Sequence, residues 1–277
     1  MSADSRQCFK ELNIGVARPT PEELAEVPHY FIASHSIHDP INAAWYEAYA
    51  LELLQKLLVN HDSVVVTGGT GLYIKALTDG LDPIPPIDNK IRQEILQTFE
   101  KKGVDWLRTQ LQAADPLFAA KGEMLNPQRM MRALEVVRST GQSILQYRST
   151  QKKSRPFGIL QIGLELPREQ LYHRINQRVD DMMLSGLAQE VQQLLPYRQT
   201  NALQTVGYKE LFEYFDGKIS LDEAVNLIQQ NTRRYAKRQM TWFKRQADMH
   251  WINLADVKNI IPTIEQLMSR LSHFKPQ

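Results

Sequence analysis

Four consecutive side chains near the start of the chain could act together on a nucleotide. Asp4, Ser5, Arg6 and Gln7 place a carboxylate, a hydroxyl, a guanidinium and an amide side by side. A carboxylate can accept a proton, and a guanidinium can bind phosphate through paired hydrogen bonds. Such a cluster can hold a base and a phosphate together. Because termini are normally poorly ordered unless tied down, we expect loose local structure around Asp4.

A glycine-rich turn is the second candidate. Residues 63–67 are β-branched and uninterrupted apart from Ser63, which predicts a buried strand, and Gly68, Gly69, Thr70 and Gly71 follow it directly. Glycines allow a tight turn whose amides point at a ligand from the start of the next helix. The alternative is a strand-to-helix turn that binds nothing.

Arginines recur at helical spacing in two further segments. Arg129 and Arg132 follow Gln128 on one predicted helix and could bind phosphates, although an ion pair between Arg132 and Glu135 would leave them on an ordinary solvated face. Arg174 and Arg178 stand one turn apart and could chelate a pyrophosphate. In the alternative they are neutralised by nearby acids, namely Asp180, Asp181 or Glu165.

The last long helix, predicted over 222–245, separates cations from apolar side chains. No acid occurs between Thr232 and Gln246, whereas an ordinary surface helix would mix acids among its cations, so this face favours a polyanion. The cations are Arg233, Arg234, Lys237, Arg238, Lys244 and Arg245, and the apolar side carries Tyr235, Ala236, Met240, Trp242 and Phe243.

A turn at 204–209 brings a phenol and an ammonium together. Tyr208 could stack on a base while Lys209 contacts a phosphate, with Thr205 and Gly207 in the same turn. Alternatively, Tyr208 packs inside the protein at the start of a helix.

Composition excludes several classes of protein. The 277 residues are 43% hydrophobic and 23% charged, with a net charge of +2, as in an ordinary globular protein with room for one large or two modest domains. No apolar run could span a bilayer and no signal peptide is evident, so we expect a cytoplasmic protein with no membrane partner. Cys8 is the only cysteine, which excludes an internal disulfide, and we expect an inert thiol. No metal-ligand pattern is present.

The order of predicted elements indicates an α/β fold with an insertion. A helix over 41–60 precedes the 63–67 strand, and strands are predicted again at 159–166 and 249–254. Pro83, Pro85 and Pro86 interrupt this alternation. Helices are predicted beyond them over 91–102, 105–114 and 128–140, and after the second strand over 167–184 and 187–195. We therefore expect a discontinuous core, 1–82 with 151–277, and a helical insertion over 83–150.

Six blocks in this order resemble the tRNA dimethylallyltransferases, also called tRNA isopentenyltransferases. They are 2–7 with Asn13-Ile14-Gly15, Gly68 to Tyr73, Asn126 to Glu135, Arg174 to Arg178, Val206-Gly207-Tyr208, and Lys237 to Phe243. The resemblance implies a parallel sheet core like that of P-loop kinases, with a helical insertion that contacts tRNA. It also implies transfer of a dimethylallyl group from its pyrophosphate to N6 of the adenosine 3′ to the anticodon.

The resemblance assigns roles residue by residue. It implies that Asp4 is the base, that Arg178 stabilises the leaving pyrophosphate with Mg²⁺ as cofactor, and that Arg174 also binds the pyrophosphate. The expected partners are the tRNA anticodon stem-loop and dimethylallyl pyrophosphate, and the chain is expected to be monomeric. The tRNA-binding set is Asp4, Ser5, Arg6, Gln7, Gly68, Gly69, Thr70, Lys90, Gln128, Arg129, Arg132, Thr205, Gly207, Tyr208, Lys209, Arg234, Lys237 and Arg238.

One departure from the family is plain. Its members carry a strand and a P-loop ahead of the Ser-Ala-Asp-Ser block, and here the sequence starts at Met1 without them. We therefore expect a chain truncated at its N-terminus, of the bacterial type, with little or no transfer activity. The alternatives are an isopentenyltransferase that acts on free adenine nucleotides and a non-catalytic RNA-binding remnant. A small-molecule kinase is disfavoured because there is no Walker lysine.

Overall fold

The chain divides into two compact units. A computed structural model describes residues 1–149, 151–255 and 259–271. Residues 1–78 and 154–277 belong to the first unit, and 79–153 form the second. The range of the second unit contains the insertion expected over 83–150.

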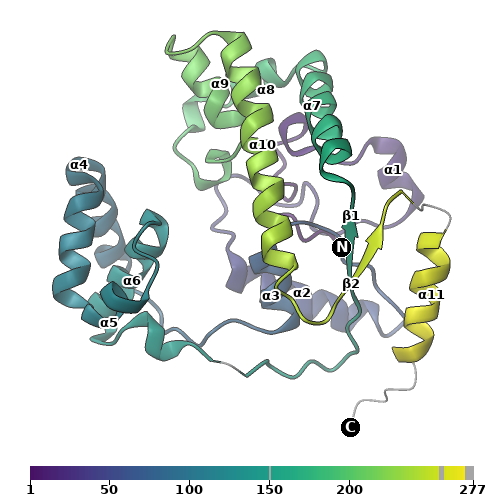
Figure 1. Cartoon of the computed structure of the whole chain (residues 1–277), viewed down its shortest axis with the longest axis horizontal. Helices are drawn as coiled ribbons and strands as arrows, with labels where there is room; N and C mark the ends of the chain where they lie inside the picture. The colour runs from purple at the N-terminus through teal and green to yellow at the C-terminus, as the bar shows by residue number, and fades with distance from the viewer. Residues whose placement is uncertain (150, 256–258, 272–277) are drawn as a thin grey trace. The chain divides into compact units, whose positions relative to one another are not determined.

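A small parallel sheet lies in the first unit. β1 (Gln161–Glu165) pairs with β2 (Met249–Asn253), in a register that runs from Gln161 opposite Met249 to Glu165 opposite Asn253. Figure 1 shows the two strands side by side. Both strands were expected from the sequence, and together with the many helices they confirm the α/β class.

The strand expected at 63–67 is not buried, and that prediction is wrong. The segment is extended and runs parallel to the start of the chain: the Met1 amino group donates to the Val65 carbonyl at 2.9 Å, and the Thr67 amide donates to the Met1 carbonyl at 3.0 Å. Only the Ser2–Thr67 bridge is regular, and Val65 is 77% exposed. β-branched residues favour extended backbone, but burial needs neighbours that cover the side chains.

Helices make up most of the first unit (Figure 1). Their starts follow local capping, since Asn42 and Ser220 accept hydrogen bonds from the first-turn amides of α2 and α10, and Thr20 forms a capping box with Glu23. The helices are α1 (Pro21–Glu26), α2 (Ala43–Leu57), α3 (Gly71–Thr78), α7 (Arg168–Leu184), α8 (Leu187–Gln193), α9 (Tyr208–Phe215), α10 (Leu221–Phe243) and α11 (Ile260–Leu271), with short 3-10 helices at Ile14–Val16, Leu195–Tyr197 and Asn201–Leu203.

Buried rings hold α2 and α3 together in the core of this unit. Tyr46 of α2 stacks on Tyr73 of α3, with ring centroids 4.4 Å apart, and its hydroxyl donates to the Ser2 carbonyl at 3.1 Å. At the end of α3, Arg155 donates to the carbonyls of Ala76 and Leu77 and pairs with Glu47 at 2.8 Å. These contacts fix the helix that begins at the glycine-rich turn.

The second unit is helical, with its own core. It contains α4 (Asn89–Ala114), α5 (Pro116–Lys121), α6 (Pro127–Thr140) and a 3-10 helix at Ile144–Tyr147. Gly103, with φ of 73°, breaks α4 between the two helices that the sequence predicts there. Gly141 caps α6 in the left-handed region, as expected. The fully buried residues between α4 and α6 include Leu107, Leu111, Met130 and Leu134.

Candidate active site

The start of the chain is anchored, so the expectation of loose structure around Asp4 is wrong. The Ser2 amide donates to the Tyr30 carbonyl at 2.9 Å, and the Ala3 amide donates to the Thr67 carbonyl at 2.6 Å. Ala3 is fully buried. These backbone bonds tie Asp4 to segments on both sides of it, because a terminus that pairs with a neighbouring strand no longer frays.

The carboxylate of Asp4 has one oxygen engaged and one free. Its Oδ1 accepts hydrogen bonds from the amides of Arg6 at 2.7 Å and Gln7 at 3.2 Å, which closes an Asx turn. In the described part of the chain, Oδ2 has no hydrogen-bond partner, and Asp4 is only partly buried. The turn therefore holds the carboxylate in place and leaves Oδ2 available to a donor from outside the protein.

The glycine-rich turn contacts the Asp4 loop directly. The hydroxyl of Thr70 accepts a hydrogen bond from the Ser5 amide at 3.0 Å and donates to the Ser5 hydroxyl at 3.3 Å. A side chain at Gly68 would overlap the backbone of Ala3, so only glycine allows this approach. The structure thus brings Asp4, Ser5, Gly68 and Thr70 together, although they are far apart in the sequence.

Gln7 holds the loop from the inside. Its amide nitrogen donates to the carbonyls of Val16 at 3.3 Å and Ala17 at 3.0 Å, and its amide oxygen accepts from the Ser2 hydroxyl at 3.3 Å. Gln7 was expected to contact tRNA. Because all these bonds are internal, a nucleotide would have to compete with them.

Glu190 gathers four donors at one carboxylate. It accepts from the backbone amides of Asn13, Ile14 and Gly15 at 2.7–3.2 Å, and from the Tyr208 hydroxyl at 2.6 Å. Tyr208 is fully buried, and its ring packs against Gly15. Burial, followed by the nearby Glu190 carboxylate, raises the pKa of Tyr208. The Glu190 carboxylate therefore fixes residues 13–15, and the carbonyls that accept from the Gln7 side chain follow directly at Val16 and Ala17.

This arrangement corrects the predictions for two residues of the tRNA-binding set. Tyr208 cannot stack on a base, because its ring is enclosed and its hydroxyl is used by Glu190. Gly207 is buried, and its amide donates to Glu210 at 2.8 Å at the start of α9. The alternative in which Tyr208 packs at the start of a helix is the one that occurs. Thr205 is partly buried and Lys209 is exposed.

Removing the Glu190 carboxylate should destabilise the first unit. Glu190→Ala leaves the Tyr208 hydroxyl and three amides without their acceptor, and we expect a loss of about 2–4 kcal/mol in the free energy of unfolding, measured in urea. Tyr208→Phe removes one bond and should cost about 1 kcal/mol. Glu169→Ala, at an exposed position of α7, serves as the control. A Glu190→Ala protein as stable as this control would contradict the assigned role.

Helix α10 presents most of its cations to solvent, but Arg233 is partly buried and donates to the Asn176 side chain at 2.5 Å. Arg234, Lys237 and Arg238 are exposed, whereas Lys244 pairs with Glu165 at 3.3 Å. Tyr235, which was expected on the apolar side, is 41% exposed and lies beneath the Arg238 guanidinium, 5.5 Å from it.

Tyr235 also lies beside the Asp4 loop, a location that the apolar-face pattern misses. Partial burial raises its pKa, and so does the Asp4 carboxylate, while Arg6 and a hydrogen bond with the Thr70 side chain act in the opposite direction. Its neighbour on the same face is Gln239, which the sequence analysis leaves without a role. Their spacing of four residues is the only sequence signal that connects the two.

Arg174 and Arg178 are exposed on α7 and form no hydrogen bond or ion pair with the described residues. The acids that could have neutralised them have other partners: Asp180 accepts from Gln229, Asp181 from Gln177, and Glu165 pairs with Lys244. The neutralised alternative therefore does not occur. Both guanidiniums are free to bind an anion.

The cations of the second unit are partly paired. Arg132 pairs with Glu135 at 3.1 Å, as the alternative reading expects, and Arg92 pairs with the same carboxylate at 3.3 Å. Arg129 lies 3.9 Å from Glu123. Gln128 and Lys90 are exposed. Because Glu135 is buried and the arginines remain partly exposed, these pairs order the guanidiniums without hiding them.

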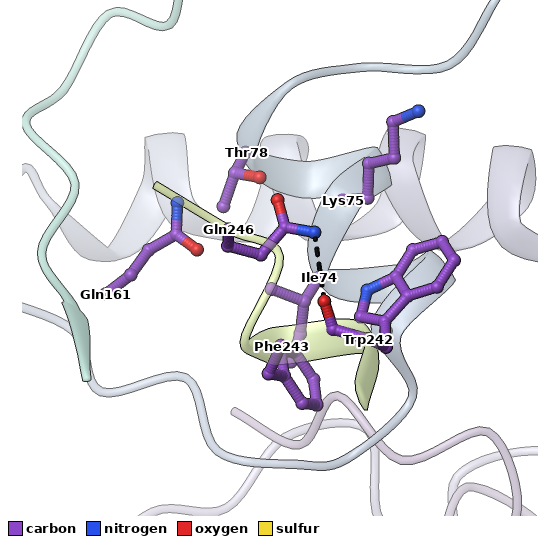
Figure 2. A pocket seen from close by; sticks show the side chains of 8 residues that line it. Ile74, Lys75, Thr78, Gln161, Trp242, Phe243 and Gln246 are labelled. Carbon is purple, nitrogen blue, oxygen red and sulfur yellow. Dashed lines mark hydrogen bonds between the residues drawn. The ribbon is translucent and has the colours of Figure 1, made fainter. Parts of the chain in front are cut away.

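A small hollow, with room for about one water molecule, lies next to the glycine-rich turn. Figure 2 shows its lining, in which the Gln246 amide donates to the Trp242 carbonyl at 3.5 Å. Lys75 and Thr78 of α3 form another side. The hollow shares only Gly71 with the turn, and neither Asp4 nor Thr70 lines it.

No metal centre is formed by the protein alone among the described residues, since no three His, Cys, Asp or Glu side chains gather there. Cys8 is buried, and burial raises the pKa of its thiol to about 12, with the Asp4 carboxylate adding to the effect. The thiol is therefore protonated at neutral pH. No helix in the described ranges is long and apolar enough to cross a membrane.

Comparison with known proteins identifies what the chain is similar to. The profile of the IPP transferase family matches residues 7–246. A tRNA dimethylallyltransferase 1 of Phocaeicola vulgatus is 47% identical over 253 residues, which cover 91% of this chain and 84% of the relative. A tRNA dimethylallyltransferase of Cytophaga hutchinsonii is 44% identical, over 96% and 87%. The crystal structure of a tRNA isopentenylpyrophosphate transferase from Bacillus halodurans superimposes with a TM-score of 0.67 at 32% identity, covering 99% of this chain and 90% of that one.

Proposed function

Because the chain belongs to the IPP transferase family, we propose that it is a prenyltransferase that modifies tRNA. The group transferred is dimethylallyl, from dimethylallyl pyrophosphate, and the acceptor is N6 of the adenosine 3′ to the anticodon. One observation supports the chemistry most directly: Asp4 is held at Oδ1 by two amides while Oδ2 is free. Since the substrate is tRNA, we place the activity in the cytoplasm, and the expected monomeric state stays a prediction.

Asp4 is the proposed base. The lone pair of the adenine N6 amine is delocalised into the ring, so the amine is a weak nucleophile. As the bond from N6 to the allylic carbon forms and the bond from that carbon to oxygen breaks, the pyrophosphate leaves with the electron pair. The N6 proton passes to Oδ2 of Asp4. The Asx turn keeps that oxygen in place during the transfer.

The leaving group acquires negative charge, which calls for fixed cations. Arg178, with Arg174 one turn before it, is the proposed partner of the pyrophosphate, because both guanidiniums lack other partners in the described structure and two such groups can bind it with paired bonds. Mg²⁺ is proposed as the cofactor. No three His, Cys, Asp or Glu side chains gather among the described residues, and Mg²⁺ is commonly held by one or two carboxylates together with substrate phosphates.

The tRNA must present a base that is normally stacked. We propose that the adenine leaves its stack to reach Asp4, as in other enzymes that modify bases. The exposed cations of α10, Arg234, Lys237 and Arg238, supply sequence-independent attraction to the RNA backbone. In the second unit, Lys90, Gln128, Arg129 and Arg132 are the proposed contacts with the anticodon stem-loop.

A competition assay tests this function against its rivals. The protein is given labelled dimethylallyl pyrophosphate, an unmodified tRNA and an excess of AMP. We expect label in the tRNA alone, with AMP reducing the yield less than twofold. Label in AMP would favour the alternative, an isopentenyltransferase that acts on free adenine nucleotides. Binding of tRNA without labelled product would favour the RNA-binding remnant. A transcript with guanosine at the target position is the matched control and should remain unlabelled.

A further inference from the structure

One face of α10 contacts the glycine-rich turn at successive helical turns. The side-chain amide of Gln239 donates to the Gly69 carbonyl at 2.9 Å. The indole of Trp242 occupies the space next to Gly71, where a Cβ would overlap it. Residues 239 and 242 are three positions apart and share one helical face, so α10 contacts the turn on both sides of Thr70.

The same turn continues into the Asp4 loop through three hydrogen bonds. The Thr70 amide donates to the Ala3 carbonyl at 3.3 Å, the Thr70 hydroxyl accepts from the Ser5 amide at 3.0 Å, and it donates to the Ser5 hydroxyl at 3.3 Å. Asp4 lies between Ala3 and Ser5. Any shift of the turn therefore moves both backbone neighbours of the carboxylate.

Gly69 has an internal partner that the sequence pattern does not predict. Its carbonyl accepts from Gln239, and a Cβ at this position would overlap the amide of the glutamine. The glycine is therefore required for the approach of α10, whether or not it also contacts tRNA. Its expected contact with tRNA stays a prediction.

We propose that Gln239 is a positioning residue that couples α10 to the Asp4 loop. Arg234, Lys237 and Arg238 project from the same helix into solvent, whereas Gln239 holds the turn that in turn holds Ser5. Because one rigid helix carries both the exposed cations and Gln239, it fixes the position of the bound RNA relative to the Asp4 carboxylate. The catalytic meaning of this coupling rests on the proposed function, but the structural link does not.

Hydrogen exchange tests the link without relying on activity. Gln239→Met keeps the length of the side chain and removes the donor. We expect amides in 1–9 and 66–73 to exchange about tenfold faster than in the unaltered protein, because the loss of one hydrogen bond loosens the bonds that protect Ala3, Ser5 and Thr70. Thr241→Ala, at an exposed position of α10 whose hydroxyl donates to the Lys237 carbonyl of the same helix, should leave both segments unchanged.

The second unit supplies an internal reference, because residues 127–140 have their own core. Unchanged exchange in 1–9 would overturn the coupling, even if 66–73 were loosened. If Gln239→Met also accelerated amide exchange in 127–140, the substitution would have unfolded the protein. Gln239→Asn, which is polar but too short to reach Gly69, would then be measured against the same criterion. Thr70→Val, which removes the next link, should loosen 1–9 to a similar extent.

A kinetic measurement separates positioning from simple stability. In Gln239→Met, turnover should fall about tenfold while tRNA affinity stays within twofold. In a Thr70→Val background the same substitution should cost less than twofold, because both act through one chain of contacts. Additive effects, or an equal loss of tRNA affinity, would overturn the proposal. Binding of tRNA without any transfer by the unaltered protein would favour the RNA-binding remnant over the proposed function instead, and the exchange experiment would still decide the link.

Discussion

In a form of the protein that is active in dimethylallyl transfer, Asp4→Ala should lower the rate at saturating substrates by about 10²–10⁴-fold, the range typical of a lost general base. The affinity for tRNA should stay within a few fold, because many cations of α10 and the second unit are expected to share the binding of the RNA. Single-turnover assays with labelled dimethylallyl pyrophosphate and a filter-binding measurement of tRNA affinity separate the two effects.

The loop geometry makes Asp4→Asn the matched control. Asparagine keeps an oxygen that can accept from the amides of Arg6 and Gln7, so the Asx turn persists, but its second atom is an amide nitrogen that cannot take a proton. If proton acceptance matters, Asn should be nearly as inactive as Ala while matching the native protein in stability. If Asn restores turnover, Asp4 serves only to shape the loop and is not the base.

Local signals in the sequence predict most of the helices and part of the site. Prolines, caps and periodicity place α2, α6, α7 and α10 within a few residues of their observed bounds. The glycines at 68–71 predict a tight turn that leads into a helix, and α3 begins at Gly71. Each of these features depends on neighbouring residues alone, so one sequence is enough to infer it.

Contacts between distant segments are what the sequence could not supply. The aromatic ring of Tyr208 is chemically suited to stack on a base. Only its packing against Gly15 and its hydrogen bond to Glu190 show that its role is structural. Gln239 carries no charge and belongs to no apolar stripe, yet it bonds to Gly69, 170 positions away. The prediction of a buried strand at 63–67 fails for the same reason, because burial depends on which other segments cover the strand.

The same kind of charge pattern gives an ion pair at Arg132 and an unpaired guanidinium, among the described residues, at Arg178. Both were expected either to bind anions or to pair with nearby acids. Arg132 pairs with the buried Glu135, whereas the acids near Arg178 are used by Gln229, Gln177 and Lys244. Spacing alone cannot separate the two cases, because it does not specify which way each carboxylate points.

Arg178→Ala should reduce transfer by about 10²–10³-fold, because charge develops on the pyrophosphate oxygens as the allylic carbon to oxygen bond breaks. Lysine keeps the charge but not the paired hydrogen bonds, so Arg178→Lys should recover only part of the rate. Arg174→Ala should act in the same direction with a smaller effect. Measured tRNA affinity should remain within twofold in all three proteins.

The control for Arg178 is another exposed arginine on the same helix. Arg168 lies over the Tyr172 ring, 5.0 Å from its centroid, so Arg168→Ala removes an equal charge from α7 without touching the proposed pyrophosphate pair. Turnover and the KM for dimethylallyl pyrophosphate should change less than twofold in this variant. If Arg178→Ala instead weakens tRNA binding and leaves single-turnover transfer intact, Arg178 belongs to the RNA interface. The leaving group would then need a different cation.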